Sequence, residues 1–196
     1  MYSQNQEEQF MLEYFKEQIG TFLEVGSFHP TIFSNTRALF EKGWNGVLVE
    51  PSPICINNLK KEYENEPRIK IIEAAITEKD GVVTFYESGG DAVGSTSLKH
   101  KEKWEAGYSV TYEEITVKSI SMETFLKDFG DKIDFLNLDV ESTNIELFNL
   151  IPDWFWERLS MLCIEHDNQQ DYIISKLQPF GFKELHRNGE NLILAK

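Results

Sequence analysis

The chain has 196 residues, enough for one domain with a substantial core, and its 41% hydrophobic and 27% charged content is typical of globular proteins in solution. The formal net charge of −14 argues against nonspecific binding to nucleic acids or anionic membranes, because both require a basic surface. No signal-peptide pattern and no apolar run of spanning length is present, and two cysteines provide neither a disulfide framework nor a zinc-binding spacing. We therefore expect a single cytoplasmic domain over residues 1–196, without a nucleic-acid or membrane partner.

Helices and strands alternate through the first part of the chain. Apolar residues at helical spacing predict a helix over residues 7–19, so that residues 1–20 form an N-terminal helix packed on the domain. Short apolar runs and their flanking turn residues predict three strands, two intervening helices and one further short strand, in the order 21–25, 35–42, 46–50, 54–63, 69–73 and 82–86.

The second part of the chain begins with its least regular stretch, residues 87–112. A glycine-rich stretch of this length predicts a functional or mobile loop. Strands and helices are then predicted in the order 115–119, 121–129, 133–139, 144–150 and 159–165. Asp167 and Gln170 have capping-box spacing for a helix to residue 177, and a turn at Asn188-Gly189 predicts a terminal hairpin of strands 182–186 and 191–195. The alternation indicates an α/β fold with a doubly wound, mostly parallel sheet and a C-terminal antiparallel hairpin.

Acidic residues close two of the predicted strands. Glu24 stands next to the end of strand 21–25, and Glu50 ends strand 46–50. Ligands of open α/β sheets bind at the carboxyl ends of the strands, where an acid can hold both hydroxyls of a ribose. After Gly26 the chain continues with Ser27-Phe28-His29-Pro30 rather than with the glycines of a dinucleotide-binding loop, so a tight pyrophosphate turn is not expected.

S-adenosylmethionine has a ribose but no phosphate, and this sequence suits it. Gly26 allows close approach, Glu24 is placed for the ammonium group, and Glu50 for the ribose hydroxyls. The start of the helix at Ser34 and Asn35 offers free N–H groups to the carboxylate. Ala74 and Ala75 are small enough for adenine to lie flat beside them.

Several stretches in order and spacing resemble the FkbM-like branch of the class I S-adenosylmethionine-dependent methyltransferases. They are residues 23–30 (LEVGSFHP), 33–36 (FSNT), 43–46 (GWNG), 49–51 (VEP), 138–141 (LDVE) and 164–167 (IEHD). The resemblance implies a seven-stranded sheet, a cofactor site that includes Ser27, and methyl transfer to a hydroxyl of a sugar or natural product. The family commonly has Asp where this chain has Glu24 and Gly where it has Ser142, which leaves the conformation after strand 133–139 open.

Methyl transfer to an alcohol needs alignment of the reacting atoms and benefits from a base. His166, just beyond strand 159–165, is the first candidate for that base, although it could equally be a loop histidine without a catalytic task. Asp139 and Glu141 follow strand 133–139. Asp139 could contact the cofactor or orient the base, and either acid could instead cap the next helix.

Two further ligand hypotheses arise from charged residues. Asp139, Asp167 and Asn168 could supply oxygen ligands to a divalent metal, but Asp167 already has a sufficient role as a helix cap, so a metal is not favoured. The basic residues 99–103 could bind an anionic acceptor such as a nucleotide-linked sugar, whereas a solvated loop face is the simpler interpretation.

The function expected from the sequence is therefore S-adenosylmethionine-dependent methylation, with a sugar, a nucleotide sugar or another small molecule as the acceptor. Two alternatives remain open. The chain could be a non-catalytic S-adenosylmethionine-binding module with an assembly or regulatory role, or an NAD-linked oxidoreductase, since Glu50 would suit that ribose too. The sequence does not identify the acceptor or the oligomeric state.

Overall fold

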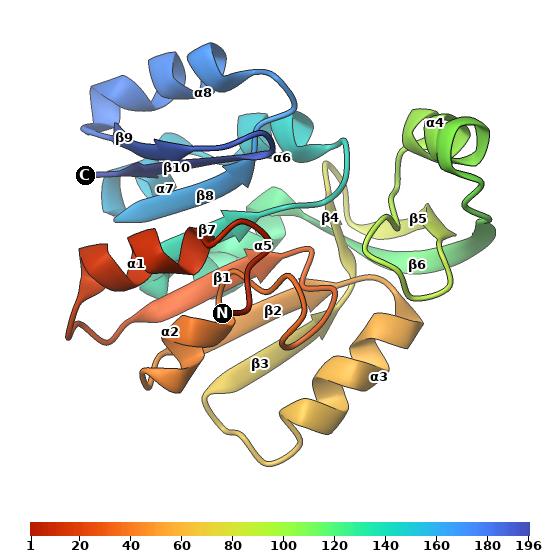
Figure 1. The fold of residues 1–196 in the computed structure, drawn as a ribbon, viewed down its shortest axis with the longest axis horizontal. Coiled ribbons are helices and arrows are strands. Elements are labelled where there is room, and N and C mark those ends of the chain that lie inside the picture. Colours follow the sequence, from red (N-terminus) through yellow and green to blue (C-terminus); the bar gives the residue numbers. More distant parts are fainter.

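The structure is a computed structural model that describes residues 1–196. Its centre is a seven-stranded sheet in the order β3-β2-β1-β7-β8-β10-β9 (Figure 1). The five strands from β3 to β8 are parallel, and β10 lies antiparallel to both β8 and β9. The bounds are β1 Thr21–Val25, β2 Asn45–Glu50, β3 Ile69–Glu73, β7 Phe135–Leu138, β8 Met161–Glu165, β9 Lys183–Arg187 and β10 Asn191–Ala195. The predicted α/β sheet with its antiparallel C-terminal hairpin is confirmed.

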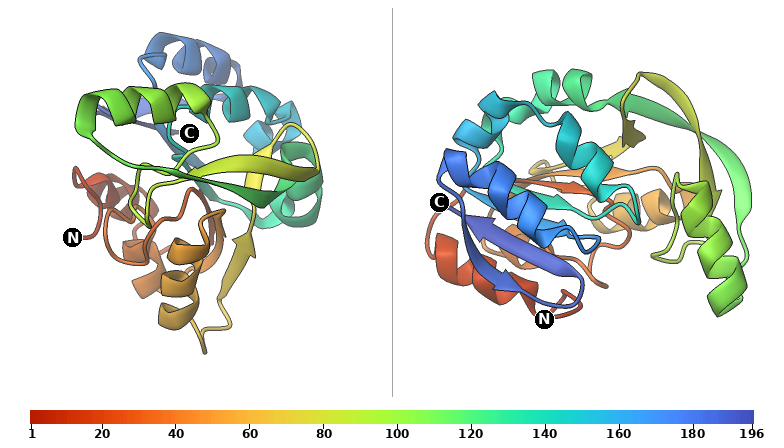
Figure 2. Two further views of the ribbon diagram at one scale, coloured as in Figure 1. Left: turned by 90° about the vertical axis from the view of Figure 1, so that its right-hand side faces the viewer. Right: turned by 90° about the horizontal axis from the view of Figure 1, so that it is seen from above.

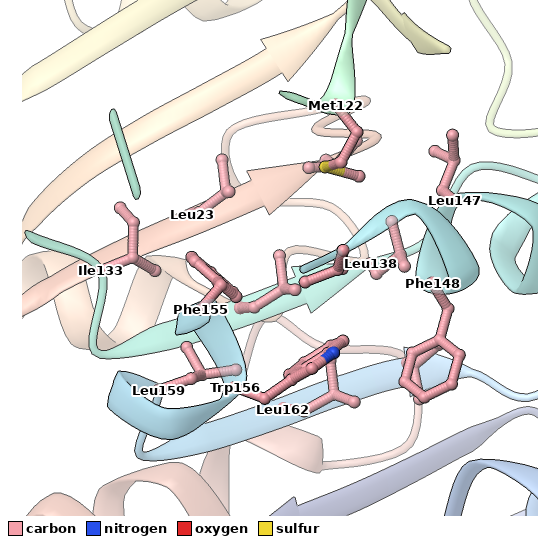
Figure 3. Close-up of a cluster of buried hydrophobic side chains, with 14 of the residues drawn as sticks. Leu23, Met122, Ile133, Leu138, Leu147, Phe148, Phe155, Trp156, Leu159 and Leu162 are labelled. Atoms are coloured by element: carbon pink, nitrogen blue, oxygen red, sulfur yellow. The ribbon is translucent and has the colours of Figure 1, made fainter. Parts of the chain in front are cut away.

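Side chains of the central strands alternate between two apolar layers, as the two-residue period of a strand requires. On one face, Phe22 and Leu48 belong to a cluster with residues of three helices, α1 Glu7–Phe15, α2 Arg37–Glu41 and α3 Pro53–Glu62. On the other face, Leu23 and Val49 belong to a larger cluster with residues of α5 Met122–Phe129, α6 Asn144–Leu150, α7 Asp153–Arg158 and α8 Gln170–Leu177. Figure 3 shows part of this second cluster, in which Trp156 of α7 is fully buried.

A second, three-stranded sheet in the order β4-β6-β5 leaves the main body after β3. With helix α4 it forms an arm, defined here as residues 75–121, which lies beyond the carboxyl ends of the parallel strands (Figures 1 and 2). The arm consists of β4 Ala75–Thr77, β5 Gly81–Glu87, α4 Leu98–Tyr108 and β6 Glu113–Ser121. The prediction of an irregular loop over residues 87–112 is therefore wrong for the residues of α4.

Helix α4 could not be recognised by periodicity because His100 is its one buried residue, so the helix has no apolar stripe. Its start is nevertheless regular, since Ser97 Oγ accepts a hydrogen bond from His100 N over 3.3 Å. Helix α7 was also missed, because six residues after Pro152 are too few to show a period. Short 3₁₀ turns at Gly130–Lys132 and Gln178–Phe180 complete the fold.

Three predicted helix boundaries require correction. Helix α1 ends at Phe15 rather than at residue 19, because Lys16 adopts a φ of +51°. Helix α2 begins at Arg37 rather than at residue 35. Helix α8 begins at Gln170, and Asp167 does not cap it, because Asp167 has a φ of +46° and lies outside the helix. None of the helices combines the length and apolar character needed to cross a membrane.

Candidate cofactor site

A pocket of ≈ 590 Å³ opens between the carboxyl ends of β1, β2 and β7 and the arm. Half of its 20 lining residues are hydrophobic and a few polar side chains lie among them, which is the composition expected of a small-molecule site. Six residues predicted from the sequence to serve binding or catalysis line this pocket: Gly26, Glu50, Ala74, Ala75, Asp139 and Glu141. The arm contributes Phe85, Asp91, Ala92, Gly94 and Thr96 to the opposite wall.

Gly26 joins the ends of the three strands. Its φ is +86°, and a Cβ at this position would lie 1.7 Å from the carbonyl oxygen of Asp139. Gly26 N also donates a hydrogen bond to Val49 O over 3.0 Å, and Asp139 N donates one to Val25 O over 3.0 Å. A side chain therefore cannot be accommodated here, and the chain crosses the floor of the pocket as bare backbone.

Glu50 is held rigidly at the end of β2. Its Oε2 accepts a hydrogen bond from Phe28 N over 2.9 Å and its Oε1 accepts one from Ser52 N over 2.7 Å. Burial raises the pKa of this carboxyl to about 7, against the opposing effect of the two N–H donors. Each carboxylate oxygen can accept a second hydrogen bond, so the two ribose hydroxyls of a nucleoside could both be held.

Glu24 lies behind the pocket wall rather than in it, since it is 3% exposed and does not line the pocket. Its Oε2 accepts a hydrogen bond from Thr36 Oγ1 over 3.0 Å, and Ser27 Oγ donates to the carbonyl oxygen of Glu24 over 3.0 Å. Burial raises its pKa to about 8. In this structure, Glu24 therefore ties the loop of residues 26–36 to β1 and does not reach the pocket.

Ser34 and Asn35 also serve this loop. Ser34 Oγ accepts a hydrogen bond from Arg37 N over 3.1 Å, which uses one of the free N–H groups that were expected to face the cofactor. Asn35 Nδ2 donates to Asn137 Oδ1 on β7 over 3.0 Å. Both side chains are buried and neither lines the pocket, so the structure places them in the support of the loop.

Carboxylates crowd the ends of β7 and β8. Burial, followed by the neighbouring carboxylates, raises the pKa of Glu141 to about 9 and that of Glu165 to about 8, and burial raises that of Asp139 to about 6. Asn144 Nδ2 donates to Glu165 Oε2 over 2.6 Å and to Asp167 Oδ2 over 3.2 Å. Such a cluster would be stabilised in its charged form by a cationic ligand.

Sequence reasoning missed Glu165 in this cluster, although it ends β8 as Glu50 ends β2. The proposed metal ligands find no support in the geometry. No group of three or more His, Cys, Asp or Glu side chains in the structure is arranged to hold an ion, and the Asp167 carboxylate already accepts a hydrogen bond from Asn144.

His166 lies outside the pocket with both ring nitrogens engaged. Its Nδ1 accepts a hydrogen bond from Asn168 N over 3.1 Å, and its Nε2 lies 3.2 Å from the Asn188 carbonyl oxygen and 3.1 Å from Gln170 Nε2. The side chain thus fastens the end of β8 to the turn of the C-terminal hairpin. The structure does not support the prediction that His166 is the base.

A different histidine, His100 of α4, reaches the end of β7. Its Nδ1 lies 2.8 Å from Ser142 Oγ, its Nε2 lies 3.1 Å from the Val93 carbonyl oxygen, and Nε2 is 3.9 Å from Glu141 Oε2. Burial lowers the pKa of His100, which favours the neutral ring. We infer that Nε2–H donates to Val93 and that Nδ1 accepts from Ser142, so that His100 attaches the arm to the edge of the pocket.

Ser142 resolves the conformation that the sequence left open. Glu141 and Ser142 have φ values of +56° and +72°, in the left-handed region that glycine adopts without steric cost. The serine therefore adopts a conformation suited to the glycine common in the family, and its hydroxyl gains a contact with His100 that glycine lacks.

The basic residues of α4 do not line the pocket. Lys101 Nζ lies 3.6 Å from Glu105 Oε2 and 3.5 Å from Glu114 Oε1. Lys99 and Lys103 are exposed. Binding of an anionic acceptor by these lysines stays a prediction.

Comparison with known proteins identifies the family. The family described as "Methyltransferase FkbM domain" matches residues 22–187. The chain belongs to the FkbM methyltransferase family. This match contains all but the first residue of the three strands whose ends meet at Gly26, together with the arm and the first strand of the C-terminal hairpin, β9.

Two solved structures have a fold similar to that of this chain, at low sequence identity. The methyltransferase FkbM of Methylobacillus flagellatus KT is 13% identical with a TM-score of 0.56, and the match covers 90% of this chain and 43% of that one. The chain therefore spans less than half the length of that protein. The SAH-bound methyltransferase PaMTH1 of Podospora anserina is 13% identical with a TM-score of 0.51, and the match covers 100% of this chain and 79% of that one. No curated protein matches this sequence.

Proposed function

We propose that this FkbM domain transfers a methyl group from S-adenosylmethionine to a hydroxyl of a small acceptor, in particular a sugar or nucleotide sugar. The observation that carries the proposal is the pocket at the ends of β1, β2 and β7, in which Gly26, Glu50 and Asp139 meet. The acceptor class follows from the family resemblance, and the pocket is consistent with an adenosyl group.

The pocket residues fit the parts of this cofactor. Glu50 would hold the ribose through its remaining lone pairs, and the absence of a side chain at Gly26 leaves backbone where the cofactor passes closest. Ala75 and Phe85 offer an apolar surface to adenine. The carboxyls of Asp139 and Glu141 would face the positively charged end of the cofactor. This charge would lower their raised pKa values and so favour the ionised carboxylates.

S-adenosylmethionine supplies a methyl group on a positively charged sulfur, so the protein chiefly has to align the acceptor oxygen and accept its proton. Glu141 is our candidate for the group that accepts this proton. It lines the pocket, and burial and its acidic neighbours raise its pKa to about 9 in the ligand-free protein. The positive charge of the bound cofactor would favour the ionised carboxylate, the form that can accept a proton. His100 would position Glu141 and Ser142 from the arm side.

Transfer can be tested directly with S-adenosylmethionine labelled in the methyl group and a panel of sugars, nucleotide sugars and small alcohols. We expect labelled product from at least one hydroxyl acceptor, and we expect Glu141→Gln to lower kcat by roughly 10²- to 10⁴-fold, the range for loss of a general base. Cofactor binding without transfer to any acceptor would instead favour the non-catalytic binding module.

A further inference from the structure

Glu87, the last residue of β5, has an unexplained buried oxygen. The residue is 6% exposed. Oε1 accepts a hydrogen bond from Gly90 N over 2.8 Å, whereas Oε2 has no hydrogen-bond partner in the structure. A buried carboxylate oxygen without a donor costs free energy. Such an atom therefore indicates a hydrogen-bond donor, such as a ligand, that the protein itself does not supply.

Glu87 itself does not line the pocket, but three observations place it close behind the wall that β5 and the following turn form. Phe85, two residues earlier on β5, lines the pocket, and residues two apart on a strand project from the same face. Asp91, in the turn that Glu87 holds through Gly90, also lines the pocket. The charge of Glu87 contributes to the raised pKa values of Glu50 and Cys55, both of which line the same pocket.

The part of the pocket assigned to adenine is otherwise poor in acceptors. It is lined by Ala74, Ala75 and Ile76, where the chain leaves β3, and by Phe85 and Cys55. The exocyclic amine of adenine is a hydrogen-bond donor, and none of these side chains carries an oxygen. An enclosed donor without an acceptor would weaken binding, so an acceptor is needed near this apolar surface.

We propose that the Glu87 side chain turns toward the pocket when the cofactor binds, so that its Oε2 accepts a hydrogen bond from the exocyclic amine of adenine and makes the site selective for an adenosyl cofactor. The arm then contributes to cofactor recognition as well as enclosing the pocket. This inference rests on the proposed function, because it takes the ligand of the pocket to be S-adenosylmethionine.

Asp91 is the rival acceptor on the same wall. It lines the pocket, but it is exposed and its Oδ1 accepts a hydrogen bond from Ala92 N over 2.7 Å. A hydrogen bond to an exposed carboxylate competes with water and discriminates less than one to a buried carboxylate. Glu87 is therefore the stronger candidate, and Asp91→Asn provides a matched variant.

The test is the choice between two ligands that differ at one position of the base, S-adenosylhomocysteine and S-inosylhomocysteine, measured by calorimetry. The inosine compound presents a carbonyl oxygen where adenine has its amine. We expect the wild-type protein to prefer the adenosine compound by roughly 10- to 100-fold. In Glu87→Gln the amide oxygen can still accept from Gly90 N and the amide NH₂ takes the place of Oε2, so the preference should vanish or invert.

Asp91→Asn should retain the wild-type preference, and thermal unfolding should show that both variants are folded. An unchanged preference in Glu87→Gln, its loss in Asp91→Asn, or equal binding of both ligands by the wild-type protein would each overturn the role of Glu87. Failure of the wild-type protein to bind either ligand would instead contradict the proposed function, and the role of Glu87 with it.

Discussion

At the scale of single residues, backbone geometry decides which side chains the pocket can use. Gly26 has no space for a Cβ, and Glu141 and Ser142 both adopt positive φ values next to it. These conformations turn the chain away from β1 and β7 at the point where a ligand must enter. Of these three residues, only Gly26 must lack a side chain both because of a backbone contact and because of its dihedral angle. Its replacement should therefore destabilise the fold most.

Gly26→Ala tests this constraint. The added methyl group would meet a backbone oxygen that cannot rotate away, in a conformation that disfavours L side chains, so we expect a loss of about 2–5 kcal/mol in the free energy of unfolding. A fall of roughly 5–15 °C in the melting temperature would follow for a chain of this size.

Gly107→Ala is the control for that measurement, because Gly107 lies in α4 and an added Cβ there would have no neighbouring atom within 4 Å. Alanine is favoured over glycine in a helix, so this variant should be unchanged or slightly stabilised. Similar melting temperatures for the two variants would show that the contact between Gly26 and Asp139 does not limit the fold.

At the scale of elements, the central strands could be predicted because each is a short apolar run buried on both faces. The strand ends then brought Gly26, Glu50 and Asp139 to one edge, since parallel strands place their carboxyl ends together. Helices α4 and α7 could not be predicted, because the first buries a single residue and the second has six residues.

The missed contacts have a related cause. His100 lies 42 positions before Ser142, and their contact exists only because the arm returns to the end of β7. Glu87 lies on β5 of the second sheet, so its proposed role likewise depends on how the arm packs beside the pocket. His166 was predicted to be the base because it follows β8. It does follow β8, but its ring contacts the hairpin turn at Asn188. Side-chain direction at a strand end depends on packing partners that the sequence pattern does not reveal.

At the scale of the whole molecule, the structure concentrates acidic groups around one pocket in a chain with a net charge of −14. Burial raises the pKa values of Glu24, Glu50, Glu141 and Glu165 from the ordinary 4.5 to between about 7 and about 9. The folded protein therefore binds more protons than the unfolded chain over this range. We therefore expect its free energy of unfolding to fall as pH rises from about 4.5 toward 9.

We expect the melting temperature of the ligand-free protein to be higher at pH 6 than at pH 8.5 by at least ~3 °C, which corresponds to roughly 1 kcal/mol for a chain of this size. Glu141→Gln should flatten this dependence, because it removes a group that titrates late. Calorimetric unfolding across the pH range provides the measurement. A melting temperature that is constant or rises with pH would show that these carboxyls are not buried as described.

We propose that an adenosyl cofactor binds where β1, β2 and β7 end, with its ribose on Glu50. Glu73 is a matched control, because it ends the neighbouring strand β3 in register with Glu50 but is exposed and pairs with Lys60. Calorimetric titration with S-adenosylmethionine should show at least ~10-fold weaker binding for Glu50→Ala and unchanged binding for Glu73→Ala. Wild-type affinity in a folded Glu50→Ala protein would show that the cofactor ribose does not bind Glu50.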